Sequence, residues 1–224
     1  MSIQVQGNGG TIAEVDGTTF RALRVTARPI DYGALGFYRL AMVSGTMAAA
    51  LAANSEIFQH RWADATRFAV TYRAAIAAGA NVAATATALV AFRLTIARSW
   101  TVAGSGGTRA NLTGNNQKLR TSMGTSLVND AGISTTGLLT AGTKTLDAQD
   151  VGAVATGIGT GAITTAVALP IMGPIELLNI DSSSDHPIVA AQNEGWVIRT
   201  GPIFPAALTW HFAVSCSWAE VAAY

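Results

Sequence analysis

Residues 210–218 read WHFAVSCSW, a stretch that alternates large apolar side chains with small or polar ones. The apolar positions are Trp210, Phe212, Val214, Cys216 and Trp218, and the positions between them are His211, Ala213, Ser215 and Ser217. Successive side chains of a β-strand point to opposite faces of its sheet. The alternation therefore predicts a core strand with a lightly polar back.

The same period of two recurs in three longer stretches, 56–63, 67–75 and 84–102, which predict half-buried strands. Shorter candidate strands cover 19–27, 37–44, 162–169, 187–191 and 196–200, and Asn193-Glu194-Gly195 is expected to form a hairpin-type turn before Trp196. Helix competes only at 46–53, which is short, and at 145–155, which lacks an apolar stripe.

Many short strands with Gly- and Pro-rich connections, and no alternation of strands with helices, predict an all-β antiparallel sandwich or barrel. Residues 1–36 are polar and punctuated by glycine, so we expect an N-terminal arm ahead of a β-domain over 37–224. The composition between 103 and 142 shifts to Gly, Ser, Thr and Asn. This segment is expected to be a long loop excursion on the surface, and loops of that length usually serve a function.

The composition narrows the function classes. Half of the 224 residues are hydrophobic and 12% are charged, which excludes disorder as the state of the whole chain. The formal net charge of +1 provides no field to attract nucleic acid or anionic lipid. The first ten residues lack the basic and apolar regions of a secretory signal, so synthesis in a cytoplasm is expected. Two uncharged runs, 74–92 and 151–175, are long enough to raise the question of a membrane-spanning helix. Both are rich in Ala, Gly and Thr, whose transfer into hydrocarbon gains little free energy, so no spanning helix is expected.

The motifs that carry chemistry are weak. One cysteine cannot form a disulfide or a thiolate metal cage, and the three histidines are isolated in sequence. Residues 137–145, GLLTAGTKT, approach a P-loop but carry an extra Thr before Lys144. Ser184, Asp185 and His186 are neighbours, and side chains of a catalytic triad must converge from separate segments. We expect no catalytic residue, cofactor or metal. A metal site assembled from separate strands and a glycosidase-like carboxylate pair stay open, since side-chain separations are not readable from one sequence.

Arginine greatly outnumbers lysine, since Lys118 and Lys144 are the only lysines. Several arginines lie close to tryptophans, as in Arg61-Trp62, Arg98-Ser99-Trp100 and the pair Trp196 and Arg199. Arg and Trp are enriched at protein interfaces, where Lys is depleted. Ordinary ion pairs on a sheet explain the pattern equally well. The scarcity of charge tips the balance toward a surface that a partner covers.

Eight segments along the chain resemble virion structural proteins of tailed bacteriophages. They are GNGG (7–10), AEVDG (13–17), ALRVT (22–26), GALGFY (33–38), FQHRWAD (58–64), ARSW (97–100) and AQNEGWVIR (191–199) with SWAEV (217–221). The resemblance covers most of the chain, and its motifs are structural rather than catalytic. It implies a β-sandwich of jelly-roll type that acts as a capsid cement or decoration protein in the virion.

The expected partners are the major capsid protein and further copies of this chain, as a dimer or trimer, with no nucleic acid and no membrane. Expected contact residues are Arg21, Arg24 and Arg28 in the arm, and Arg109, Asn115, Asn116, Lys118 and Arg120 in the excursion. The alternative is a neck, tail or fibre component, including a receptor- or glycan-binding module with Trp100 or Trp196 as an aromatic platform. Exposure of those rings would separate the two hypotheses.

Overall fold

The computed structural model describes residues 36–82, 84, 86–158, 171–180, 186–222 and 224, and the backbone alone of 15–16, 22–23 and 169–170. The chain divides into two compact units, residues 1–31 and 32–224. In the first unit, strands β1 (Val15–Asp16) and β2 (Ala22–Leu23) pair antiparallel. The predicted arm otherwise lies outside the described residues, as do its three arginines.

The second unit consists of two antiparallel sheets. The larger sheet has the order β10-β6-β13-β4-β8-β7, with β9 added beside β6. Its strands are β4 (Glu56–Trp62), β6 (Ala88–Val102), β7 (Thr108–Arg109), β8 (Asp130–Ile133), β9 (Thr143–Leu146), β10 (Gly152–Ile158) and β13 (Glu194–Thr200). The smaller sheet has the order β11-β5-β14-β3, with β12 beside β5. Its strands are β3 (Phe37–Val43), β5 (Phe68–Ala80), β11 (Leu169–Asn179), β12 (Ile188–Ala190) and β14 (Trp210–Val221).

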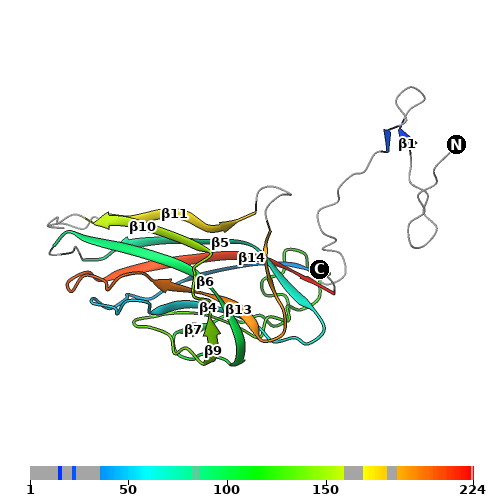
Figure 1. The fold of residues 1–224 in the computed structure, drawn as a ribbon, viewed down its shortest axis with the longest axis horizontal. Coiled ribbons are helices and arrows are strands. Elements are labelled where there is room, and N and C mark those ends of the chain that lie inside the picture. The colour runs from blue at the N-terminus through cyan, green and yellow to red at the C-terminus, as the bar shows by residue number, and fades with distance from the viewer. Residues whose placement is uncertain are drawn as a thin grey trace. The chain divides into compact units, whose positions relative to one another are not determined.

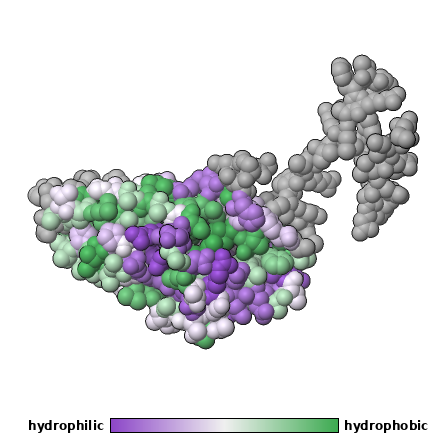
Figure 2. Space-filling model, viewed as in Figure 1, coloured by the Kyte–Doolittle hydropathy of each residue, from purple (hydrophilic) through white to green (hydrophobic). Residues whose placement is uncertain are grey.

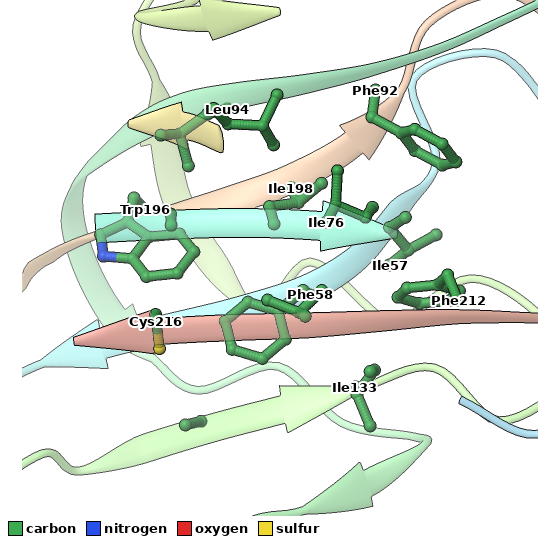
Figure 3. Packing of buried hydrophobic residues seen from close by; sticks show 14 of the residues in the cluster. Ile57, Phe58, Ile76, Phe92, Leu94, Ile133, Trp196, Ile198, Phe212 and Cys216 are labelled. Carbon is green, nitrogen blue, oxygen red and sulfur yellow. The ribbon is translucent and has the colours of Figure 1, made fainter. Parts of the chain in front are cut away.

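The two sheets form a β-sandwich, with β10 and β11 side by side along one border (Figure 1). One hydrophobic core lies between them. Phe58, Trp196 and Ile198 come from the larger sheet, and Ile76, Phe212 and Cys216 from the smaller one (Figure 3). All five tryptophans are fully buried. At about 25 cal/mol per Å² of apolar surface, such large side chains dominate the stabilisation of the fold.

The alternation in 210–218 has the predicted outcome, because all five of its apolar side chains are at most 2% exposed. The predicted strands over 56–63, 67–75 and 84–102 correspond to β4, β5 and β6, although β5 runs on to Ala80. The described residues contain no helix, so 46–53 is irregular and 145–155 spans the end of β9 and the start of β10. The predicted strand over 162–169 falls outside the described residues except for Leu169. No described segment has the helical length and apolarity that a membrane crossing requires.

The expected hairpin before Trp196 is wrong. A turn is present, with the Glu194 amide donating to the Ala191 carbonyl at 3.1 Å and Asn193 at a φ of 60°. However, β12 pairs with β5 in the smaller sheet, whereas β13 pairs with β4 and β6 in the larger one. The turn therefore carries the chain from one sheet to the other. Local sequence encodes the turn but not which sheet receives the next strand.

The segment 103–142 differs from the expected surface excursion. It contains β7 and β8, and its buried apolar side chains are Leu112, Met123, Val128, Ala131, Ile133 and Leu139. These residues are spaced irregularly in sequence, so no periodic signal announces their burial. Residues 113–116 and 119–122 are exposed, as are 105–108 and 140–142, so only part of the segment faces solvent.

Candidate functional site

A β-bulge in β4 brings Glu56 and Gln59 to the same side of the larger sheet. The register of β4 against β13 shifts between Ile198 and Arg199, and both Ile57 and Phe58 lie in the core. A bulge places two successive residues opposite one residue of the partner strand and interrupts the alternation of faces. Glu56 therefore shares a side of the sheet with Gln59, and the Gln59 Nε2 donates to Glu56 Oε2 at 2.6 Å.

Lys144 of β9 meets the same carboxylate. Its Nζ donates to Glu56 Oε2 at 2.7 Å and also to the Ala141 carbonyl. The two side chains are only 2% and 8% exposed, and the ammonium lies 4.3 Å from the ring centre of Trp100. Burial lowers the pKa of Lys144, while the hydrogen bond to Glu56 and its charge act in the opposite direction.

Gln59 is fixed from both ends of its amide. Besides Glu56, its Nε2 donates to the Thr140 carbonyl at 2.8 Å. Its Oε1 accepts from Arg109 Nη1 at 3.1 Å, and the same nitrogen donates to Asp130 at 3.1 Å. Burial raises the pKa of Asp130, and the charge of Arg109 opposes that rise. We call Glu56, Gln59, Trp100, Arg109, Asp130 and Lys144 the Glu56 cluster.

Two buried donor atoms of the Glu56 cluster, Arg109 Nη2 and Trp100 Nε1, have no hydrogen-bond partner among the described residues. Buried polar groups are nearly always satisfied in folded proteins, and unpaired ones occur at sites of strain or chemistry. The Glu56 cluster therefore combines buried charged side chains with two unpaired buried donors, which makes it a candidate for chemistry in the described domain.

Other charges form ion pairs beside the Glu56 cluster. Asp150 accepts from Arg199 at 3.0 Å and from the Thr95 hydroxyl at 2.6 Å. Arg98 contacts Asp147 at 2.9 Å and Glu194 at 3.0 Å. The arginines that sequence analysis grouped with tryptophans are thus engaged within the chain. On the face that Figure 2 shows, hydrophilic and hydrophobic areas lie next to one another.

The predicted contact residues separate into three groups. Arg21, Arg24 and Arg28 lie outside the described residues. Arg109 is only partly exposed and belongs to the Glu56 cluster. Asn115, Asn116 and Arg120 are exposed on one loop, together with half-buried Lys118, whose Nζ donates to Asn115 at 3.3 Å. These four residues lie on one surface segment, residues 115–120, which we call the 115–120 loop.

A buried carboxylate that sequence analysis missed anchors the chain just after the 115–120 loop. Glu220 is 1% exposed and accepts from Ser126 Oγ at 2.7 Å, the Leu127 amide at 3.0 Å and Trp218 Nε1 at 3.2 Å. Burial raises the pKa of Glu220, and these hydrogen bonds oppose the rise. The alternation of 210–218, continued by two residues, would have placed Glu220 on the core face.

The loop has a second anchor on the smaller sheet. The Tyr38 hydroxyl donates to the Gly124 carbonyl at 2.9 Å, and the Arg39 amide donates to the Gln117 carbonyl at 3.3 Å. The backbone of Lys118 also forms a bridge with Tyr38 of β3. The loop is therefore held against the domain by backbone contacts at Gln117 and Lys118 and by contacts of the residues that follow it.

The proposed aromatic platforms are wrong as stated. Trp100 and Trp196 are both 0% exposed, so neither ring offers an open face to a sugar. Trp196 instead stacks on His60 and Phe58 in the core. Its Nε1 donates to Thr71 at 3.1 Å. Sequence alone cannot separate a surface tryptophan from a core one when both lie in alternating strands.

The remaining motifs from the sequence are placed as follows. Residues 137–142 lead into β9 rather than into a helix. Among the described residues no group of three or more His, Cys, Asp and Glu side chains is arranged to hold a metal ion. Cys216 is buried, and burial raises the pKa of its thiol to about 12. Ser184 and Asp185 lie outside the described residues.

The comparisons with known proteins found no family model and no curated protein that matches this chain. Function therefore has to be argued from the geometry. The two features of the described domain that bear on function are the anchored 115–120 loop and the Glu56 cluster.

Proposed function

We propose that the chain is a structural component of a tailed-phage particle, a cement or decoration protein with a jelly-roll type sandwich. Its partners would be the major capsid protein and further copies of the chain in the virion. The observation that best supports this proposal is the 115–120 loop, which presents polar and cationic side chains from a firmly anchored position.

Anchoring matters because ordering a loop on binding costs about 0.5–1.5 kcal/mol for each immobilised side chain. The contacts of Glu220 and Tyr38 hold this loop before any partner arrives. Leu119, at 59% exposure, adds an apolar contact between the polar ones. A pre-ordered loop with an exposed leucine and arginine has the composition of an interface element.

The rest of the surface fits the same interpretation. Lys144 is buried, so Lys118 is the one lysine left at the surface of the described domain. Large apolar side chains that remain exposed are Val43, Val82, Leu89, Val102, Leu119, Leu138, Val151, Ile175, Ile203 and Tyr224. A surface poor in lysine, on a chain with a formal net charge of only +1, favours association over a free monomer.

A cement protein would act through thermodynamic linkage between binding and the stability of the shell. A protein that binds an assembled lattice, but not its separate subunits, stabilises the lattice by mass action. No chemical step is required. Binding instead depends on the fit of a rigid surface that repeats over the shell.

Alanine at Asn115, Asn116 and Arg120 together should weaken binding to purified particles that lack the protein by about tenfold or more, since arginine truncations at interfaces often cost about 2 kcal/mol. Binding is measured by co-sedimentation over a concentration series. The matched control is R39A/T136A/Q149A, which removes one arginine and two neutral polar side chains at other exposed positions.

A second variant, R21A/R24A/R28A, tests the N-terminal segment in the same assay, and weaker binding is again expected. Equal binding by the 115–120 variant, its control and the unmodified chain would remove the loop from the interface. Equal binding by the arginine variant would do the same for the N-terminal segment.

A further inference from the structure

The Glu56 cluster contains the components of an amide-exchange reaction. An amine, Lys144 Nζ, and a carboxamide nitrogen, Gln59 Nε2, are both hydrogen-bonded to the same oxygen, Glu56 Oε2, at 2.7 and 2.6 Å. We propose that Lys144 and Gln59 form an intramolecular isopeptide bond between β9 and β4, with Glu56 as the proton carrier. This proposal does not depend on the proposed function.

The reaction balances without any further reagent. Nζ of Lys144, as the neutral amine, attacks Cδ of Gln59, and Glu56 accepts the proton that the nitrogen loses. The same carboxyl then delivers the proton to Nε2. The Cδ–Nε2 bond breaks, ammonia leaves, and the new Nζ–Cδ amide remains. Glu56 ends in the protonation state in which it began, as a general acid–base catalyst does.

The carbonyl oxygen of Gln59 faces a cationic donor. Its Oε1 accepts from Arg109 Nη1, so negative charge that develops on this oxygen would be stabilised by a guanidinium. Asp130 fixes that guanidinium through the same nitrogen. Because Nε2 has two acceptors, Glu56 and Thr140, while Oε1 faces a donor, the hydrogen bonds define the orientation of the amide.

The surroundings make the neutral amine easier to reach than in water and shield it from solvent. Lys144 is 2% exposed at its side chain and packs against Trp100, which is 0% exposed. Desolvation lowers the pKa of Lys144, and nearby Arg109 lowers it further, while Glu56 and Asp130 raise it. A buried lysine with a lowered pKa is a usual enzyme nucleophile. Holding amine and amide on one carboxylate also makes the reaction intramolecular.

The consequence for the domain is a covalent link across its most polar region. The bond would close a long loop of chain that includes β5, β6, β7 and β8. A cross-link of this kind restricts the unfolded chain, as a disulfide does, but is not reversed by reductants. It would suit a protein that has to resist force or heat without disulfides.

Intact-mass spectrometry of the denatured full-length protein tests the proposal. We expect a mass lower by about 17 Da than the sequence mass, because one ammonia is lost when the amine displaces the amide nitrogen. Proteolysis should release a branched peptide that joins Gln59 to Lys144. Lys118→Arg, at the only other lysine, should keep the mass loss, whereas Lys144→Arg and Glu56→Gln should restore the full sequence mass.

The branched peptide distinguishes the bond from a succinimide at an asparagine, which loses the same mass but joins no two segments. A folded unmodified protein that keeps its full sequence mass after prolonged incubation would overturn the proposal. So would a mass loss that persists in Lys144→Arg. If a variant fails to fold, the mass of the unmodified chain and its peptide map still decide the question.

Discussion

Acidification should destabilise the domain by about 3 kcal/mol through His60 alone, as the pH falls from 6.5 to about 4. His60 is 1% exposed, stacks on Trp196 at 5.1 Å and meets Trp218 edge to face at 5.0 Å between ring centres. Neither ring nitrogen has a hydrogen-bond partner on another described residue. Burial therefore disfavours the charged imidazolium and lowers the pKa of His60 from 6.5 to about 4.

The direction of the effect follows from proton binding. Between pH 6.5 and about 4, His60 is protonated in the unfolded chain but neutral in the folded one. The unfolded state then binds more protons, so the free energy of unfolding rises with pH in this window and falls on acidification. Above pH 6.5 the histidine is neutral in both states and adds no pH dependence.

His60→Phe is the variant that isolates this contribution. Phenylalanine keeps an aromatic ring against both tryptophans and removes the titrating group, and any overpacking cost is the same at every pH. Chemical denaturation at several pH values gives the free energy of unfolding for both proteins. The difference between them should shift by about 3 kcal/mol in favour of the variant between neutral pH and pH 4. Parallel pH profiles would contradict a buried neutral His60.

Glu220→Ala should lower the free energy of unfolding by about 3 to 5 kcal/mol, since it leaves several buried or half-buried donors without their acceptor. Those donors are the Ser126 hydroxyl, the Leu127 amide and the Trp218 indole. Glu220→Gln keeps one side-chain oxygen as an acceptor and should cost less. The measurement is again denaturant unfolding.

The matched control for Glu220 is Glu176→Ala. Glu176 also accepts a hydrogen bond, from Arg73 at 2.6 Å, but both side chains are about one-third exposed. An exposed ion pair is worth up to about 1 kcal/mol, so this variant should remain nearly as stable as the unmodified domain. Hydrogen exchange at the Leu127 amide should speed up in Glu220→Ala alone. Equal losses of stability in the two variants would contradict the anchoring role of Glu220.

The parts of the fold that follow a regular period were predictable from sequence. Alternation located β4 within one residue and β14 within three, because burying one face of a strand requires apolar side chains at every second position. The polar continuation at Glu220 carried the same signal but breaks the rule that core positions are apolar. A buried carboxylate is recognisable only once its donors are known.

The Glu56 cluster was hidden for a different reason. The bulge at Ile57 and Phe58 changes the face on which Glu56 lies, and a single extra residue leaves no mark in the alternation. The contact of Glu56 with Lys144 then depends on how β9 is added beside β6. Pairing between distant strands depends on the whole sheet, so the sequence around Lys144 could not predict its contact with Glu56. In the sequence, Lys144 was notable only as part of a run that resembles a P-loop.

Two buried carboxylates, Glu220 and Glu56, each hold a distant segment of the chain through hydrogen bonds. Glu220 holds the chain that follows the 115–120 loop, and Glu56 holds the segment that carries Lys144. The hydrogen bonds of Glu220 fix a segment of irregular structure, whereas those of Glu56 link β4 to β9. The 115–120 loop then needs less ordering on binding, because the backbone beside it is already held.

The most direct test of the proposed function is cryo-electron microscopy of purified virions of the phage that the proposal takes as the source of this chain. The account predicts density for the sandwich on the shell at the junctions between capsomers, with the 115–120 loop against the capsid protein. Density only at the neck, tail or fibres would replace the cement role by the alternative of a tail component. Absence of the chain from the particle would contradict the proposal that it is a virion structural protein.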